Sequence, residues 1–133
     1  QPDAALVDYM QRARAFVFAA EEDFGISVVE AQACGTPVIA LGRGGVREIV
    51  VESQDPERAT GLFFGEQSVE SIVDAVERFE QSPPFRAEVC RRNALRFTQE
   101  RFRREFLSVV ERAVEDSKVA ADPAPEIRRW RSA

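Results

Sequence analysis

Short apolar runs and a helical repeat alternate along the first part of the chain. Residues 15–20 (AFVFAA) and 38–41 (VIAL) show no polar alternation, which predicts two strands that are covered on both faces of a sheet. Between them, residues 26–34 have a helical pattern, and Gly35 and Pro37 stand where a helix ends. The pattern predicts a strand–helix–strand unit with parallel strands, because parallel neighbours need a crossover of this kind.

The hydrophobic pattern predicts further elements on both sides of this unit. Residues 46–51 follow a glycine-rich turn, and their β-branched content suggests a strand. Ser68 is a suitable N-cap for the helix that follows it. In the next helix, Val89, Cys90 and Leu95 are expected to face the core. The other expected elements are helices over residues 4–13, 69–79, 85–97 and 98–116, a loop over 52–59 and a strand over 60–64.

The expected fold class is α/β: a partial Rossmann-like parallel sheet with flanking helices, ending in long C-terminal helices. Three strands are fewer than the roughly five or six of a complete doubly wound sheet. We therefore expect residues 1–116 to form part of a domain and residues 117–133 to form a linker and tail. An incomplete sheet leaves a strand edge unpaired, and such an edge pairs readily with another chain. We expect the chain to self-associate through this edge.

Composition narrows the range of functions. The 133 residues carry a formal net charge of −5, which argues against a nucleic-acid partner because such a partner requires a basic face. No apolar run reaches the length of a membrane-spanning helix. The chain has no histidine, and Cys34 and Cys90 have no metal-ligand spacing, so we expect no metal and no cofactor. Two free cysteines fit a reducing, cytoplasmic setting.

Three acids stand where the chain turns from the first strand into the helix. Glu21, Glu22 and Asp23 follow the carboxyl end of a strand, where open α/β sheets bind ligands, and Gly25 allows a tight turn. The start of the helix offers unpaired N–H groups that suit a phosphate. Carboxylates repel phosphate but accept strong hydrogen bonds from hydroxyl groups. A nucleotide sugar, which has both phosphate and hydroxyl groups, is the ligand that this combination predicts.

The order of these residues resembles that of a known family. The similarity is carried by Glu22 and Glu30 in an E-x7-E motif, by the run AQACGTPVIA after it, by GG-x-x-E at residues 44–48 and by GLF at residues 61–63. Together they resemble family 4 of the retaining glycosyltransferases with the GT-B fold, over roughly residues 6–115. The resemblance is to the latter part of the second, nucleotide-sugar-binding domain. It also implies a short helix at residues 46–51, as the alternative to a strand there. We therefore expect the chain to be a C-terminal piece of a longer enzyme.

The resemblance implies roles for the acids of the motif. Glu22 matches the catalytic acid beside the transferred sugar, and Glu30 matches the acid that accepts hydrogen bonds from the ribose hydroxyls. Each also has a plainer interpretation, as a solvated loop acid and as an exposed helix glutamate. Asp23 replaces a glycine found in many relatives, and the resulting EDFG sequence favours GDP-mannose as the donor.

Other candidate residues would bind through the main chain. Backbone N–H groups at the start of the helix would meet sugar oxygens or the diphosphate, while the side chain of Phe24 is expected in the core. The glycine pair after the second strand either admits the nucleotide to close backbone contact or simply forms a turn. These substrate-binding candidates are Phe24, Gly25, Ile26, Ser27, Gly44 and Gly45.

The resemblance implies transfer of a sugar from a nucleoside diphosphate sugar to a hydroxyl of an acceptor glycan or lipid-linked glycan. The chain alone is expected to be inactive, because acceptor contacts come mainly from the other GT-B domain. A nucleotide-sugar epimerase, a phosphorylase or a non-catalytic nucleotide-binding module are the alternatives. The basic and aromatic tail at residues 128–131 could touch an anionic membrane surface or be the remnant of a helix that crosses to the first domain.

Overall fold

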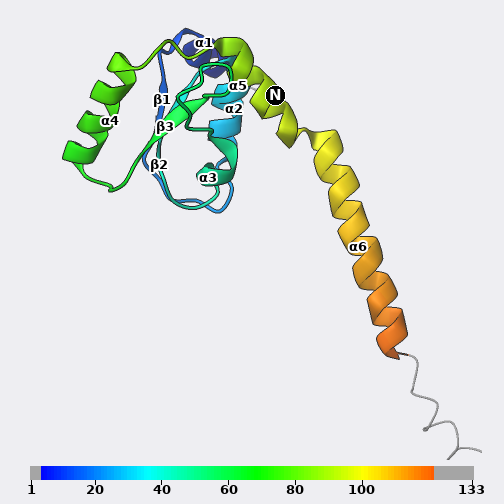
Figure 1. Ribbon diagram of the computed structural model, residues 1–133. Helices are drawn as coiled ribbons and strands as arrows, with labels where there is room; N and C mark the ends of the chain where they lie inside the picture. Colours follow the sequence, from blue (N-terminus) through cyan, green and yellow to red (C-terminus); the bar gives the residue numbers. More distant parts are fainter. Residues whose placement is uncertain (1–3, 122–133) are drawn as a thin grey trace, which may run out of the picture. The chain divides into compact units, whose positions relative to one another are not determined.

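The computed structural model describes residues 4–121, and the side chains of residues 4–117. The chain divides into two compact units, one up to Phe97 and one from Thr98 onward. The first unit contains a parallel sheet and its helices, and the described part of the second unit is one long helix (Figure 1). The elements are α1 (Ala4–Arg12), β1 (Phe16–Phe18), α2 (Ile26–Cys34), β2 (Val38–Leu41), α3 (Val46–Ile49), β3 (Gly61–Phe64), α4 (Val69–Gln81), α5 (Ala87–Ala94), the 3-10 turn η1 (Leu95–Phe97) and α6 (Gln99–Ala121).

The sheet has three parallel strands in the order β1-β2-β3. Val17 is level with Ile39 of β2, and Ile39 is level with Leu62 of β3. The expected α/β class and the strand–helix–strand unit are therefore confirmed. Gly35 ends α2 in the left-handed conformation, with φ of 92°, and its N–H bonds back to the last turn as the sequence predicts.

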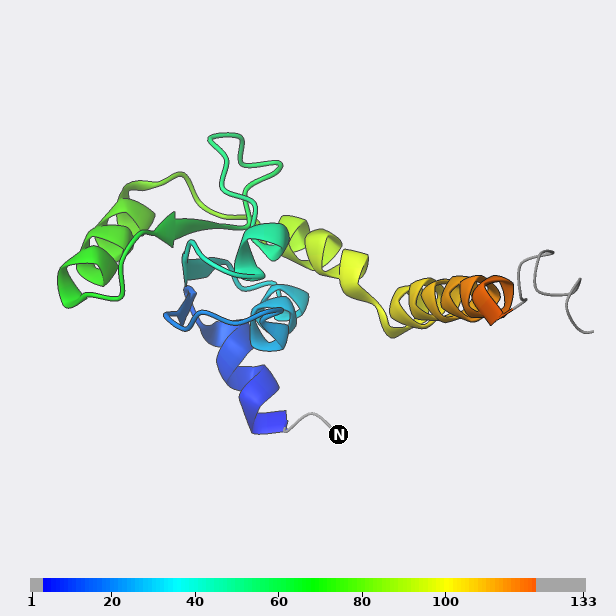
Figure 2. The same cartoon turned by 90° about the horizontal axis from the view of Figure 1, so that it is seen from below.

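Helices cover the sheet from both sides, as Figures 1 and 2 show. On one side, α1, α2, α3 and α5 enclose a core that includes Phe18, Val28 and Ala40. On the other side, α4 packs on β2 and β3 over Ile39 and Leu62. Neighbouring residues of a strand point to opposite faces of the sheet. Because helices cover both faces of β2, all four of its residues are buried and apolar.

The first strand is less buried than the sequence predicts. The sequence predicts that β1 is covered on both faces, but Val17 is 46% exposed. The reason is that β1 lies at the edge of the sheet, and α4 packs mainly on β3 and β2. An apolar run in a strand therefore does not by itself distinguish a central strand from an edge strand.

Three local predictions are settled by the structure. Residues 46–49 form the helix α3 and not a strand. The segment at 85–97 divides into α5 and a 3-10 turn, and Leu95 is 69% exposed instead of facing the core. Ala94 takes the buried position because it follows Cys90 by four residues and shares its face of the helix.

The described part of the second unit consists of α6, which runs to Ala121 and thus past the predicted end near Asp116. Its first turn is capped by Thr98, whose hydroxyl accepts a hydrogen bond from the N–H of Arg101 at 3.2 Å. Phe102 and Phe106 stack along the helix. The predicted linker at 122–125 and the basic tail at 128–131 lie outside the described residues, and the domain division at residue 116 stays a prediction. Over residues 4–121, no helix is both long and apolar enough to span a membrane.

Candidate functional site

The loop between β1 and α2 is shaped by a left-handed glycine. Gly25 has φ of 85° and ψ of 56°, a conformation that residues with a Cβ rarely adopt. It is buried, and a Cβ there would lie 3.4 Å from Val46 of α3. Gly25 therefore turns the chain sharply into α2 and keeps the loop close to α3.

The start of α2 has free hydrogen-bond donors. The N–H of Val28 donates to the carbonyl of Gly25 at 3.0 Å. The N–H groups of Ile26 and Ser27 have no acceptor among residues 4–121, and no side chain caps the helix. These donors and the positive end of the helix dipole together favour an anion or a polar oxygen at this position.

The acids of the motif are all exposed to solvent. Glu22 and Asp23 lie in the loop before α2, and Glu30 lies in the second turn of the helix. Ile26 and Glu30 are four residues apart and share the exposed face of α2. Because side chains tilt toward the N-terminus of a helix, the Glu30 side chain extends toward the helix start. No contact in the described part of the chain joins the two glutamates directly.

The glycine-rich turn after β2 packs directly against the acidic loop. The N–H of Gly45 donates to the carbonyl of Glu22 at 2.9 Å. A Cβ on Gly44 would collide with the carbonyl oxygen of Glu22, and a Cβ on Gly45 with that of Asp23. The sequence suggested that these glycines admit a ligand or form a simple turn. In the structure the close backbone approach is to the acidic loop itself, so the glycine pair positions the loop.

The side chain of Phe24 is not in the core as the sequence predicted. It is 47% exposed and packs edge-on against Phe97, with ring centroids 5.8 Å apart. The reason is that Phe24 stands just before the αL turn, which buries Gly25 and leaves its predecessor at the surface.

A buried network of polar side chains fixes α2 to its neighbours. The sequence analysis did not predict this network. Gln32 is fully buried, donates to the hydroxyl of Thr60 at 3.2 Å and accepts from Asn93 at 2.6 Å. Asn93 also donates to the carbonyl of Ile49 at 2.6 Å. The network joins α2, α3, α5 and the start of β3. The sequence signal for this network is Gln32, an amide side chain among the apolar buried residues of α2.

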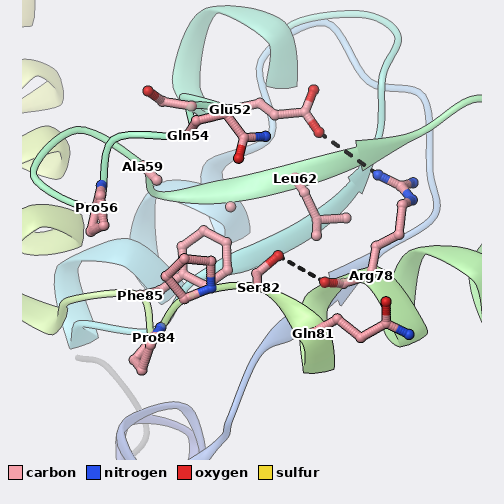
Figure 3. A pocket seen from close by; sticks show the side chains of 13 residues that line it. Glu52, Gln54, Pro56, Ala59, Leu62, Arg78, Gln81, Ser82, Pro84 and Phe85 are labelled. Carbon is pink, nitrogen blue, oxygen red and sulfur yellow. Dashed lines mark hydrogen bonds and ion pairs between the residues drawn. The ribbon is translucent and has the colours of Figure 1, made fainter.

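A cavity of about 310 Å³ lies elsewhere, along the outer side of β3. Figure 3 shows Glu52 and Gln54 on one wall, Ser82, Pro84 and Phe85 on the other, and Leu62 on the strand between them. None of the residues predicted for the site lines this cavity. The predicted residues gather instead at the carboxyl ends of β1 and β2, where the acidic loop, the start of α2 and the glycine turn meet.

Comparison with known proteins shows the family of the chain. The sequence profile of the family "Glycosyl transferases group 1" matches residues 1–96. The chain belongs to this family. The residues that carry the resemblance to family 4 retaining glycosyltransferases run from the loop before α2 to β3. That resemblance is confirmed.

Individual relatives share about a third of the aligned residues with this chain. The chain is 32% identical over 90 residues to a "D-inositol 3-phosphate glycosyltransferase" of Frankia alni, a match that covers 67% of this chain and 21% of the relative. It is 33% identical over 96 residues to the protein of that name in Saccharomonospora viridis, covering 70% of this chain and 21% of the relative. It is 36% identical over 67 residues to a "Sucrose synthase" of Solanum tuberosum, covering 47% and 8%. The match therefore spans about a fifth or less of each relative's length.

Proposed function

We propose that this chain is the donor-binding part of a retaining glycosyltransferase. The reaction is the transfer of a sugar from a nucleoside diphosphate sugar to a hydroxyl acceptor, with the anomeric configuration kept. The observation that carries the proposal is the pair of unpaired N–H groups at Ile26 and Ser27 between two exposed acids, Glu22 and Glu30, in a chain of the group 1 family. Hydrogen-bond donors suit the phosphates, and carboxylates suit the hydroxyls.

In this proposal each group has a distinct role. The start of α2 binds the diphosphate or sugar oxygens, and Glu30 accepts hydrogen bonds from the ribose hydroxyls. Glu22 lies beside the sugar and stabilises the positive charge that develops at the anomeric carbon in the transition state. Such a charge interaction accelerates transfer because it is stronger in the transition state than in the ground state.

The identity of the donor and acceptor is a finer proposal. The EDFG sequence at residues 22–25 favours GDP-mannose, whereas the names of the relatives mention D-inositol 3-phosphate and sucrose. We take GDP-mannose as the donor to test first and UDP-glucose as its comparison. The proposed acceptor is a hydroxyl of a glycan or of a lipid-linked glycan.

Donor binding can be measured on this chain directly. We expect GDP-mannose or UDP-glucose to shift the amide resonances of Ile26 and Ser27 in a titration followed by NMR. Glu30→Ala should weaken binding about tenfold to a hundredfold, because a hydrogen bond to a charged group contributes roughly 1.5–3 kcal/mol.

The matched control for this titration is Glu21→Ala. It removes another exposed acid, from the loop before α2 and outside the E-x7-E spacing, and should leave the affinity unchanged. If neither nucleotide sugar perturbs these amides at millimolar concentration, or if both variants weaken binding equally, the assignment of the site is wrong.

A further inference from the structure

The acidic loop of the candidate site is held by α3, a helix of only four residues. The turn at the start of α3 contacts the loop, because the N–H of Gly45 donates to the carbonyl of Glu22 at 2.9 Å. A helix of one turn has few hydrogen bonds of its own, so contacts with the rest of the fold must fix its position. The position of Glu22 therefore depends on what holds α3.

Two side chains from α5 and η1 cap the other end of α3. The amide of Asn93 donates to the carbonyl of Ile49 at 2.6 Å, and the guanidinium of Arg96 donates to the carbonyl of Glu48 at 3.2 Å. Arg96 also donates to the amide oxygen of Asn93 at 2.9 Å. The last carbonyls of a helix have no partner within that helix, and these side chains satisfy two of them. The segment from α5 to η1 therefore fixes α3 at the end away from the acidic loop.

The amide of Asn93 also holds α2. It donates to the side-chain oxygen of Gln32 at 2.6 Å, and Gln32 is fully buried in α2. The same helix begins with the N–H donors of Ile26 and Ser27. Asn93 thus joins the helix that carries these donors to the helix that holds Glu22. Hydrogen bonds require a defined distance and angle, which apolar contacts do not, so this junction fixes the spacing of the two parts.

A second contact reaches the acidic loop from the same segment. The ring of Phe97, at the end of η1, packs edge-on against the ring of Phe24, with centroids 5.8 Å apart. The guanidinium of Arg96 lies over the ring of Phe97, 5.1 Å from its centroid. Phe24 follows Asp23 directly, so this contact acts on the loop without passing through α3. The segment from α5 to η1 therefore supports the acidic loop by two routes.

We propose that Asn93 is a positioning residue for donor binding. Its three hydrogen bonds, to α2, α3 and η1, set the distance between the acidic loop and the start of α2, where the nucleotide sugar would bind. An apolar side chain could fill the same space, but it would not fix this distance. The inference rests on the proposed donor site, and all the contacts behind it join residues within 22–97.

Hydrogen exchange of the ligand-free chain tests whether Asn93 holds the loop. Asn93→Asp keeps the size of the side chain but replaces its N–H donors with an oxygen that faces two acceptors. We expect α3 to loosen and the amide of Gly45 to exchange about tenfold faster. The amide of Gly42 is the internal reference, because it stands three residues earlier and donates to Phe64 of β3 at 2.9 Å. A general loss of stability would accelerate both amides equally.

Donor affinity gives the second measurement. In the titration with GDP-mannose or UDP-glucose, Asn93→Asp should weaken binding about tenfold. Arg91→Ala is the matched control, because Arg91 also lies on α5 and donates to the carbonyl of Cys34 at 3.0 Å, at the end of α2 away from the loop. It should leave both the exchange ratio and the donor affinity unchanged. Circular dichroism checks folding, and Asn93→Ala, which adds no charge, takes the place of the aspartate variant if that variant does not fold.

The role of Asn93 and the proposed function can fail separately. Equal acceleration of the Gly42 and Gly45 amides overturns the role of Asn93, and so does equal weakening of donor binding by Arg91→Ala. Unchanged donor affinity in the Asn93 variant overturns it as well. If the unmodified chain binds neither nucleotide sugar, the proposed function is wrong and the role in donor binding falls with it, while the exchange ratio still shows whether Asn93 holds the loop.

Discussion

Single residues determine where the acidic loop lies. Gly25 takes a left-handed conformation that few other residues tolerate, and Gly44 and Gly45 let two loops touch through their main chains. The position of Glu22 therefore depends on glycines about twenty residues further along the chain. The candidate site is built on backbone contacts, and the side chains of its acids are exposed on top of them.

The glycine contact gives a prediction about stability. Gly45→Ala, whose φ of −64° is ordinary, should still destabilise the fold by about 1–3 kcal/mol because its Cβ collides with the carbonyl of Asp23. Gly44→Ala adds the strain of a φ of +66° and should cost at least as much. Urea unfolding measures both. Gly65→Ala is the control, since nothing lies within 4 Å of its Cβ position. Equal effects at all three positions would show that the contact is unimportant.

The two cysteines should differ in reactivity. Burial raises the pKa of the Cys90 thiol to about 11, whereas Cys34 is partly exposed. The thiolate is the reactive form. At pH 8 we therefore expect Cys34 to react rapidly with a thiol reagent and Cys90 to react only when the chain unfolds. Cys90→Ala should retain the fast phase and Cys34→Ala should lose it. Two fast phases in the folded chain would contradict this.

The raised pKa of Cys90 also makes the stability of the fold depend on pH. Because the folded pKa of Cys90 lies above its ordinary value, the unfolded chain loses this proton first as the pH rises. The folded state is then disfavoured, so its stability falls between the ordinary thiol pKa and about 11 and is unaffected by this group at lower pH.

At the scale of elements, the capping residues in the sequence agree with the observed helix ends. Ser68 adopts an extended conformation before α4, and its hydroxyl accepts from the N–H of Ser71 at 3.1 Å. Gly35 ends α2, and the carbonyl of Cys34 accepts a hydrogen bond from Arg91 of α5 at 3.0 Å. The caps fix where the helices begin and end, and contacts between elements then fix how they pack.

The N-cap of α4 can be tested by substitution. Ser68→Ala should destabilise the unit by about 1 kcal/mol, because the N–H of Ser71 loses its acceptor. Ser68→Asp, which restores an acceptor at the same position, should recover the loss. Thermal unfolding followed by circular dichroism compares the three proteins. If the aspartate variant is as unstable as the alanine variant, capping is not what this serine contributes.

At the scale of the whole molecule, the matched region covers only 21% of the inositol-phosphate glycosyltransferases that it resembles. The resemblance implies that acceptor contacts come mainly from the other GT-B domain, so we expect donor binding and sugar transfer to be separable. Over residues 4–121, the first unit carries the motif on a three-stranded sheet, and the second unit forms one helix with exposed apolar residues.

This separation predicts that the chain binds a donor but does not transfer its sugar. Incubation of the chain with GDP-mannose or UDP-glucose and a saccharide acceptor should give no glycosylated product by mass spectrometry. The NMR titration described above, run on the same preparation, is the control that the site is folded. Product formation above the rate without protein would refute the prediction.

The sequence by itself determined the local features of this protein. Apolar runs, helical spacing and glycine or serine at helix ends depend on neighbouring residues only, so the strand–helix–strand unit, the αL end at Gly35 and the cap at Ser68 were all predicted correctly. The family resemblance is also carried by local runs, the E-x7-E spacing from Glu22 to Glu30 together with the segments after it up to residues 61–63.

Only the tertiary structure decided features that join distant segments. It showed that Val17 of β1 is exposed, that Leu95 faces solvent, and that Gly45 contacts the acidic loop. Burial and close approach are set by whichever element packs against a residue, and the spacing of neighbours does not encode that partner. The same reason hid the network of Gln32 with Asn93, whose partners are 61 residues apart.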